Sequence, residues 1–287
     1  MMETITLNSG ARMPQLGIGV YQVSSADCGP ALADAFAAGY RSVDTANAYL
    51  NERAVGEAMR DSGLQREEIF LTSKLWPPDF RYDRAVVAIE RTLKRLGTDY
   101  VDLLLLHQQY GDYKGAWKAM EEAVASGKVR AIGVSNFNQD RFTDLAENAN
   151  ILPALSQVEC HPYFQQRELK GFLAQFGTAI EAWYPLGHGH RGLLAEPLFA
   201  QLAEKNGKSA VQVILRWHMQ EGNIAIPRST NPMHIRSNFD IFDFSLTSDE
   251  MALIAALDRD RPFFRMPEFV GKIVFPAARI DFDKRQR

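Results

Sequence analysis

Short apolar stretches alternate with longer amphipathic stretches along most of this chain. Tyr100–Leu106 is almost continuously apolar, which is typical of a parallel strand buried on both faces. Tyr82–Leu96 instead repeats its apolar residues at helical spacing and is followed by Gly97, a common helix stop. The strands predicted in this way span residues 16–20, 40–44, 69–74, 100–106, 129–134, 155–159, 178–183 and 223–227. The predicted helices span residues 31–38, 52–62, 82–96, 115–126, 139–148, 167–176, 197–206, 210–219, 232–239 and 248–257.

The order of these elements predicts the fold class. Strands alternate with helices and only a few residues connect them, which indicates a parallel sheet with crossover helices. Eight such units within about 270 residues favour a closed (α/β)8 TIM barrel over an open doubly wound sheet. Thr4–Leu7 and Ala11–Leu16 predict an N-terminal β-hairpin before the barrel. The helices predicted beyond the last strand are extra C-terminal helices.

The whole chain, residues 1–287, is expected to form one domain, because no linker, repeat or low-complexity run interrupts the pattern. We expect the tail after Pro262 to be irregular. We also expect its end to be loose, because charged residues gather there. These residues are Asp281, Asp283, Lys284, Arg285 and Arg287.

The composition is that of an ordinary globular protein, with 46% hydrophobic and 23% charged residues. A net charge of −3 does not favour nucleic acid as a partner. The sequence shows no apolar run of 18 residues and no leader, so we expect a cytoplasmic protein with no membrane partner. Cys28 and Cys160 are too few for a cysteine metal site, and a disulfide between them is not expected. We expect a monomer.

Four candidate catalytic residues follow predicted strands, at the end of a barrel where active sites lie. Asp44, Lys74 and His107 end three strands, and Tyr49 follows Asp44 on the outgoing loop. This set suits proton transfer rather than covalent catalysis. An ammonium group near a phenol favours the phenolate and lowers the phenol pKa, and a carboxylate keeps the ammonium charged and in place. We therefore predict that Tyr49 is a general acid controlled by Lys74 and Asp44, and that His107 donates a hydrogen bond to the substrate oxygen.

Each candidate also has an ordinary structural interpretation. Asp44 could only cap a helix, and Lys74 could be a solvated lysine at a strand end. His107 could be a core histidine with its hydrogen bonds satisfied, and Trp183 could only pack in the core. The functional interpretation is favoured because all the candidates lie at predicted strand ends.

Six sequence motifs resemble those of the aldo-keto reductase superfamily, in the same order. They run from Asp44-Thr45-Ala46-Asn47-Ala48-Tyr49 and Thr72-Ser73-Lys74-Leu75-Trp76 through Leu104-Leu105-Leu106-His107, Gly133-Val134-Ser135-Asn136-Phe137 and Gln157-Val158-Glu159-Cys160-His161-Pro162 to Ile226-Pro227-Arg228-Ser229. The match extends from about Leu7 to Leu257. The region from His107 to Trp117 is similar to the branch that contains bacterial 2,5-diketogluconate reductases and prostaglandin F synthase-like enzymes.

This resemblance implies an NADPH-dependent reductase of aldehydes and ketones, and it implies the same catalytic roles for the four rim residues. It also implies that Ser135, Asn136 and Gln157 bind the carboxamide of the nicotinamide. Trp183 would lie under the nicotinamide ring and hold one face of it toward the carbonyl carbon. The residues implied for the adenosine end are Arg228 and Ser229 at the 2′-phosphate, and His234 and Asn238 near the adenine.

The chain departs from the family pattern at four positions. Arg228 replaces the usual lysine, which keeps the charge and adds a bidentate group for phosphate. His234 stands where an arginine commonly pairs with the 2′-phosphate, and Arg236 lies on nearly the opposite helix face. NADPH is therefore the expected cofactor, with NADH as the alternative. Tyr184 replaces a small residue beside a cofactor phosphate, and Gln109 replaces a proline near the substrate.

Tyr21, Trp76 and Trp117 are expected to line an aromatic pocket for small carbonyl substrates. Phe263 and Phe264 either join this pocket or pack the tail on the barrel.

Two other function classes are alternatives to a reductase. The first is a protein that binds NADPH and a partner and has slow chemistry or none, similar to the barrel-type regulatory subunits of potassium channels. A metal-dependent barrel hydrolase would need several His and acidic ligands at the rim, where only Asp44 and His107 qualify. A Rossmann dehydrogenase is disfavoured because no G-x-G-x-x-G joins a strand to a helix.

Overall fold

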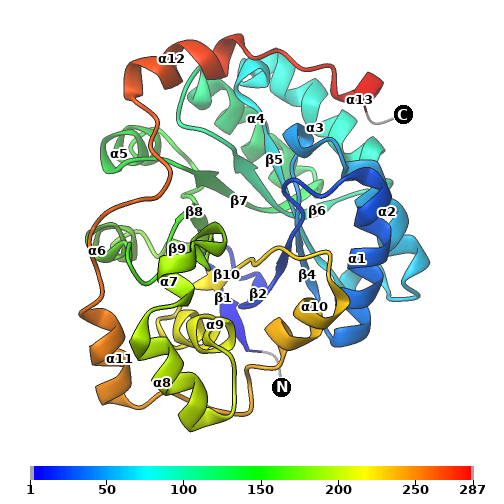
Figure 1. The fold of residues 1–287 in the computed structure, drawn as a ribbon. Coiled ribbons are helices and arrows are strands. Elements are labelled where there is room, and N and C mark those ends of the chain that lie inside the picture. Colours follow the sequence, from blue (N-terminus) through cyan, green and yellow to red (C-terminus); the bar gives the residue numbers. More distant parts are fainter. Residues whose placement is uncertain (1–2, 286–287) are drawn as a thin grey trace.

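The computed structural model describes residues 3–285 and shows a barrel of parallel strands surrounded by helices (Figure 1). Neighbouring strands in the sheet follow the order of the chain, from β3 to β10. The barrel strands are β3 (Ile18–Gly19), β4 (Ser42–Asp44), β5 (Phe70–Leu75), β6 (Val101–Leu106), β7 (Val129–Ser135), β8 (Leu155–Glu159), β9 (Ala179–Trp183) and β10 (Ile224–Ala225). The predicted (α/β)8 barrel is confirmed.

Backbone hydrogen bonds between the first and last strands close the barrel. Leu16 and Ala225 form a parallel bridge. The amide of Gly17 donates to the carbonyl of Ala225 at 2.9 Å, and the amide of Gly19 donates to the carbonyl of Pro227 at 3.2 Å. Because closure leaves no edge strand, the C-terminal ends of all eight strands form one continuous rim.

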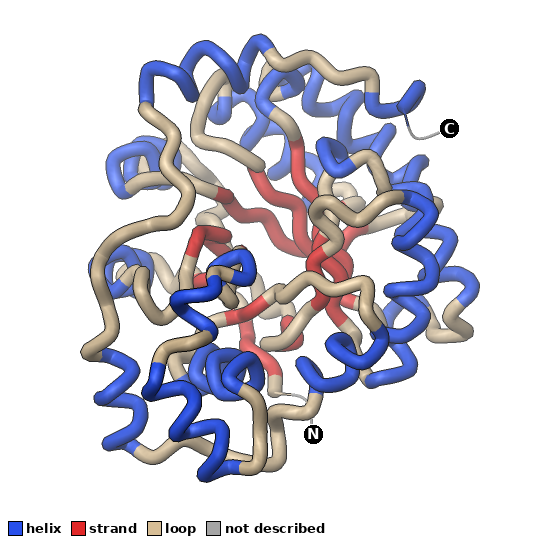
Figure 2. The backbone as a smooth tube through the Cα atoms, in the orientation of Figure 1, coloured by secondary structure: helices blue, strands red, loops and turns tan. Residues whose placement is uncertain are grey.

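Helices surround the strands on the outside of the barrel (Figure 2). They are α1 (Ser25–Ala38), α2 (Glu52–Asp61), α3 (Tyr82–Leu96), α4 (Tyr113–Ala125), α5 (Gln139–Ala146), α6 (Arg167–Ala174), α7 (Arg191–Leu194), α8 (Pro197–Asn206), α9 (Ala210–Gln220), α10 (Pro232–Phe239), α11 (Ser248–Ala255), α12 (Glu268–Ala277) and α13 (Phe282–Arg285). Four short 3₁₀ helices are η1 (Asn47–Tyr49), η2 (Arg66–Glu68), η3 (Pro77–Asp79) and η4 (Gly187–Gly189). Among residues 3–285, no helix is both long enough and apolar enough to span a membrane.

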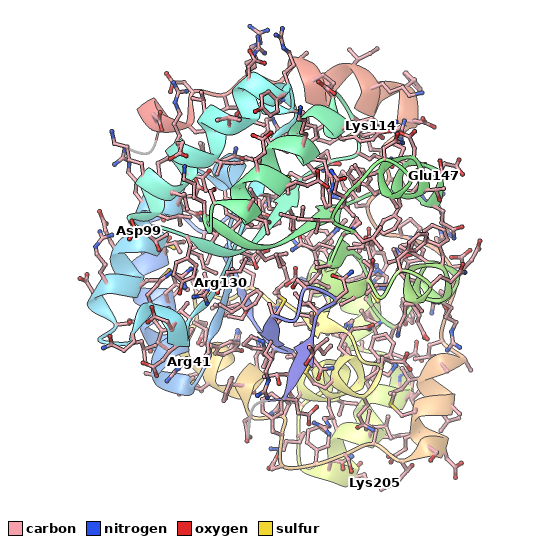
Figure 3. All side chains as sticks on the ribbon, turned by 180° about the vertical axis from the view of Figure 1, so that it is seen from behind. Arg41, Asp99, Lys114, Arg130, Glu147 and Lys205 are labelled. Atoms are coloured by element: carbon pink, nitrogen blue, oxygen red, sulfur yellow. The ribbon has the colours of Figure 1, made fainter. Side chains whose placement is uncertain are left out.

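The predicted N-terminal hairpin is also present, as β1 (Thr4–Thr6) and β2 (Arg12–Pro14). Leu7 and Met13 pack in one buried cluster with Phe70 and Ala154, which lie at or just before the starts of barrel strands. The view from behind shows the hairpin in front of the barrel, with Arg41 and Arg130 labelled beside it (Figure 3). The hairpin therefore covers the N-terminal end of the barrel and leaves the opposite rim open for a site.

The prediction of an irregular tail is wrong, because the tail forms α12 and α13. Gly271 and Pro276 lower the helix propensity of this segment, and Gly271 is the buried residue of α12, whereas the apolar Phe269 and Ile273, one turn apart, are exposed. Tertiary packing stabilises this helix. Gly271 lies so close to Tyr110 that a Cβ would come within 2.4 Å of the ring, and the rings of Phe275 and Tyr110 stack at 5.5 Å.

The predicted loose end is wrong for its first residues. Phe282 is buried, and Asp283 forms an ion pair of 2.7 Å with the buried Arg95 on α3. Lys284 and Arg285 extend α13, and Arg287 lies outside the described residues. The buried Arg95, together with Arg91 at 3.7 Å from Asp283, therefore attaches the last helix to α3, which residue composition did not indicate.

Candidate active site

The four predicted catalytic residues meet at the rim. Asp44 ends β4, Lys74 lies near the end of β5, His107 directly follows β6, and Tyr49 is the last residue of η1. The Nζ of Lys74 donates to Oδ1 of Asp44 at 2.6 Å and to the hydroxyl of Tyr49 at 3.1 Å. The rings of Tyr49 and His107 meet edge to face at 5.5 Å between centroids. One compact group therefore holds a carboxylate, an ammonium, a phenol and an imidazole.

The ammonium group of Lys74 uses all three of its hydrogen bonds inside the protein. Its third acceptor is the carbonyl of Thr45, at 3.0 Å. Because Lys74 donates to the oxygen of Tyr49, the hydroxyl hydrogen of Tyr49 must point elsewhere. That hydrogen is then available to a group outside the Asp44–Lys74 pair.

Lys74 is charged in this setting although it is fully buried. Burial alone would lower the pKa of Lys74, but the charge of Asp44, the phenol of Tyr49 and the hydrogen bonds to both raise it above the usual value. A buried pair of this kind is a poor source of stability, because both ions lose their hydration. Its retention is better explained by the control of a neighbouring group.

The pKa of Tyr49 differs from the sequence-based expectation. Burial raises the pKa to about 12, and although the charge of Lys74 lowers it, Asp44 raises it again. The predicted effect of Lys74 is therefore present, but desolvation outweighs it. The phenol remains fully protonated at neutral pH, as a proton donor must be.

His107 is neutral at neutral pH. Burial, and then the nearby charge of Lys74, hold its pKa well below the usual value. Its Nδ1 is buried and has no hydrogen-bond partner among the described residues. A neutral imidazole has one N–H group, and with the proton on Nε2 it can donate one hydrogen bond to a substrate oxygen.

The loop that carries Tyr49 is held by residues that the sequence analysis missed. The side chain of Asn51 accepts a hydrogen bond from Thr45 at 2.8 Å and donates to the carbonyls of Val20 and Val23. These bonds connect the loops after β4 and β3. Asn51 directly precedes α2, but its side chain caps no amide of that helix, and its partners are set by the approach of the two loops.

Gln157 lies deeper than its predicted role suggested. Its Nε2 donates to Oδ2 of Asp44 at 2.8 Å and to Oε2 of Glu181 at 2.6 Å. Only its carbonyl Oε1 is thus available to a ligand at the rim. Glu181 was also not included in the sequence analysis. It lies two residues before Trp183 in the apolar strand β9, and residues i and i+2 of a strand share a face. An acid at this position could therefore have been assigned to the same side of the sheet as Trp183.

Ser135, Asn136 and Trp183 form a second group beside the first. The Nδ2 of Asn136 donates to the hydroxyl of Ser135 at 3.1 Å, and the Nε1 of Trp183 donates to Oδ1 of Asn136 at 2.9 Å. Asn136 has a left-handed backbone, with φ of 60°, which turns its side chain toward β9. The indole of Trp183 is partly exposed and fixed in orientation, so it presents an aromatic surface at the rim.

The residues predicted for the adenosine end lie in the loop after β10 and in α10. Arg228 is exposed, and its Nη1 donates to the carbonyl of Gln22 at 3.3 Å, which spans the gap to the loop after β3. Ser229 and His234 lie before and within the first turn of α10, and Asn238 is buried further along the helix. Arg236 turns toward α1, where it lies 3.6 Å from Asp34. It therefore cannot replace His234, as the helix geometry predicted.

The tail contributes to the predicted pocket in a way that the sequence did not show. Trp76 packs against His107 at 5.0 Å and against Phe275 of α12 at 5.4 Å, and its Nε1 donates to the carbonyl of Ala278 at 3.0 Å. Tyr21 packs against Tyr49 at 5.0 Å and is 44% exposed, so it lies at the mouth of the site. Aromatic side chains from two loops and the tail therefore surround the rim group.

The placement of Trp117 in the pocket is wrong. Trp117 on α4 is buried in the core, and its Nε1 donates to the carbonyl of Ile151 at 3.1 Å. Ile151 precedes β8, so the indole points toward the N-terminal end of the barrel, away from the rim. The direction of a helical residue depends on the rotation of the helix about its axis, which sequence periodicity does not determine.

The side chains of Phe263 and Phe264 lie in different places. Phe263 stacks on His161 and on His190, both at 4.3 Å, so it packs the tail on the barrel. Phe264 is about half exposed and lies 6.1 Å from Trp183, so it reaches the rim. The backbone amides of both residues donate to the carboxylate of Glu159, at 2.6 and 3.1 Å. The tail is therefore attached to the end of β8.

The remaining two departures from the family pattern both affect rim loops. Tyr184 has a left-handed backbone with φ of 53°, and its ring packs on Trp183 at 4.6 Å and on His188 at 4.4 Å. The side chain of Gln109 accepts a hydrogen bond from the amide of Asn138 at 2.9 Å, which connects the loop after β6 to the start of α5.

Comparison with known proteins agrees with this geometry. The sequence profile described as the Aldo/keto reductase family matches residues 13–259. An aldo-keto reductase of Mycolicibacterium smegmatis is 46% identical over 261 residues, which cover 90% of this chain and 94% of the relative. Glyoxal reductase of Bacillus subtilis is 43% identical over 262 residues, which cover 91% and 94%. The crystal structure of a Bombyx mori aldo-keto reductase in complex with NADP has a TM-score of 0.89 and 33% identity, and the match covers 96% of this chain and 99% of that one.

Proposed function

Because this chain belongs to the aldo/keto reductase family and is therefore an oxidoreductase, we propose that it reduces aldehydes and ketones with NADPH. One observation supports the proposal most strongly. Lys74, paired with Asp44, donates a hydrogen bond to the hydroxyl of Tyr49 beside the neutral ring of His107. This arrangement provides one proton donor and one hydrogen-bond donor for a carbonyl oxygen at the same point.

The rim residues fit a nicotinamide cofactor. The fixed indole of Trp183 offers a flat surface for the ring, and Ser135, Asn136 and Oε1 of Gln157 can bind its carboxamide. Arg228, Ser229 and the first turn of α10 would bind the 2′-phosphate, because exposed guanidinium groups and helix N-termini favour anions. His234 and Asn238 would contact the adenine. When bound, the cofactor supplies the hydride.

The protein residues then have separate roles at the carbonyl. His107 donates a hydrogen bond that orients the carbonyl oxygen. As negative charge develops on that oxygen, Tyr49 transfers its proton to it, and Lys74 stabilises the phenolate that remains. Asp44 does not contact the substrate and acts by keeping Lys74 charged and in place. Proton transfer is favourable although the pKa of Tyr49 is about 12, because an alkoxide is far more basic than a phenolate.

The substrate class follows from the walls of the site. Tyr21 packs on Tyr49, Trp76 packs on His107 and Phe264 lies beside Trp183, and these partly exposed aromatic side chains suit small apolar or aromatic carbonyl compounds. The relative named glyoxal reductase is consistent with small dicarbonyl substrates. We propose the 2,5-diketogluconate reductase-like branch on the sequence motifs alone.

The test is to mix the protein with NADPH and a panel that includes methylglyoxal and 4-nitrobenzaldehyde, and to follow loss of absorbance at the reduced-nicotinamide band. We expect saturable oxidation of NADPH with at least several aldehydes. Tight cofactor binding without turnover of any carbonyl would overturn the proposal and favour a cofactor-sensing role.

A further inference from the structure

We propose that Glu181 is a positioning residue of this site, which fixes the amide of Gln157 so that Nε2 points inward to Asp44 and Oε1 points outward to the nicotinamide carboxamide. The inference rests on the proposed function and deepens it. It gives a role to a buried acid that lies outside the four catalytic residues.

The strand register places Glu181 beside Gln157. The two residues are Cα partners on the parallel strands β8 and β9, and Ile224 of β10 is the partner of Glu181 on its other side. Both side chains are buried inside the barrel, with relative exposures of 0% for Glu181 and 2% for Gln157. Asp44 reaches the same point from β4. Gln157 therefore connects β8 with β4 through the barrel interior.

The hydrogen bonds fix which end of the amide points inward. The Nε2 of Gln157 has two N–H groups, and one acceptor oxygen is present for each, on Asp44 at 2.8 Å and on Glu181 at 2.6 Å. A flipped amide would place Oε1 against the carboxylate of Asp44 and leave two inward acceptors without donors. Oε1 is thus the atom presented to the rim, and it can only accept hydrogen bonds, from an N–H or an O–H group. A carboxamide has such a group.

Glu181 can occupy this position without adding a second charge. Burial, and then the charge of Asp44, raise the pKa of Glu181 to about 8, while the hydrogen bond from Gln157 and the charge of Lys74 lower it in part. It is therefore mostly protonated at neutral pH. Asp44 from β4 and Lys74 from β5 are the charged groups that act on it, and Gln157 from β8 is neutral. The proton belongs on Oε1, which has no partner among the described residues, because Oε2 accepts from Gln157.

A binding experiment tests this role separately from turnover. The wild-type protein is titrated with NADPH and with its 3-acetylpyridine analogue in the reduced form. In this analogue an acetyl group, which has a carbonyl but no N–H, replaces the carboxamide. We expect NADPH to bind at least tenfold more tightly. In Glu181→Met, which removes the acceptor but keeps the length, the preference should decrease to threefold or less. Glu181→Gln keeps an acceptor oxygen and should restore the wild-type preference.

Further variants separate positioning from general stability. A purely structural role would weaken both ligands equally and leave the ratio unchanged, which would overturn the inference. In a Gln157→Leu background the ratio should already be lost, and adding Glu181→Met should not change it. If Glu181→Met does not fold, Glu181→Leu replaces it in the same series. If the wild-type protein binds NADPH and reduces aldehydes but does not prefer NADPH over the analogue, only this inference is overturned. If it does not bind NADPH, the proposed function is overturned as well.

Discussion

The Nζ of Lys74 lies 3.1 Å from the hydroxyl of Tyr49 and donates a hydrogen bond to it. This contact leaves the hydroxyl hydrogen as the one mobile proton of the group, since every hydrogen of the ammonium group is engaged within the protein. This contact predicts how the replacement of either residue changes catalysis.

Tyr49→Phe should bind NADPH as the wild type does but lose carbonyl reduction. General acid catalysis contributes roughly 10²–10⁴-fold, so kcat should decrease by that range. Cofactor binding is measured by fluorescence quenching and turnover by NADPH oxidation. Tyr21→Phe is the matched control, because Tyr21 packs on Tyr49 through its ring. Turnover of Tyr49→Phe within threefold of the wild type would remove Tyr49 from the acid role.

Replacing Lys74 should change the pH dependence of the reverse reaction. Alcohol oxidation needs the phenolate of Tyr49, and the charge of Lys74 lowers the pKa of that phenol. Without this charge the pKa is higher, so the rise of the oxidation rate with pH should move to higher pH in Lys74→Met. Because a lone buried Asp44 would cost roughly 3–5 kcal/mol, the cleaner variant is the double substitution with Asp44→Asn. An unshifted profile would contradict the assignment.

Arg228→Ala should weaken NADPH binding and leave NADH binding nearly unchanged. A hydrogen bond to a charged group contributes about 1.5–3 kcal/mol, which corresponds to roughly 10–100-fold in Kd. His234→Arg should have the opposite effect, because it adds a second guanidinium beside the first turn of α10. Arg236→Ala is the control, since Arg236 faces Asp34. Equal affinity for both cofactors in the wild type would mean that this site does not select for the 2′-phosphate.

Glu159→Gln should loosen the tail. The carboxylate accepts the amides of Phe263 and Phe264, and an amide side chain can accept through only one oxygen. We expect trypsin to cleave after Arg265 several-fold faster, and KM for aldehydes to rise more than kcat changes. Glu168→Gln is an exposed control on α6. Unchanged proteolysis would show that the stacking of Phe263 is sufficient to hold the tail.

The buried histidines predict how stability depends on pH. Burial lowers the pKa of His218 to about 3, although the hydrogen bond with the carbonyl of Pro185 raises it in part. The other ring nitrogen lies 3.2 Å from Nδ2 of Asn223, from which the neutral ring can accept a hydrogen bond. Because the folded pKa is below the unfolded value of 6.5, stability is complete above about pH 6.5 and is lost as the pH decreases toward 3. Between pH 6 and 4, the free energy of unfolding of the wild type should decrease with each pH unit by about 1.4 kcal/mol more than that of His218→Gln, as measured by urea unfolding. The exposed His234→Gln should match the wild-type slope.

The pattern of the chain was sufficient for the barrel and for the location of its site. Strand and helix order depend on local periodicity and on stop residues such as Gly97, whose left-handed φ of 65° ends α3 as predicted. Parallel strands that close into a barrel necessarily bring their C-terminal ends to one rim. For this reason Asp44, Lys74 and His107 could be grouped before their distances were known.

The helical tail and the position of Trp117 could not be predicted in this way. The α12 helix contains Gly271 and Pro276, which disfavour a helix, and its contacts with Tyr110 and Trp76 join segments more than 150 residues apart. The direction of Trp117 depends on the rotation of α4, which periodicity does not determine.

The sequence by itself determined which residues lie at which strand ends, because alternating burial and local stops are properties of neighbouring residues. Only the tertiary structure decided what those side chains do to one another. Whether burial or Lys74 controls the pKa of Tyr49 depends on depth in the barrel, and whether Gln157 contacts Glu181 depends on strand register. Desolvation and hydrogen bonding vary over ångströms between residues distant in the chain, and these distances exist only once the barrel has closed.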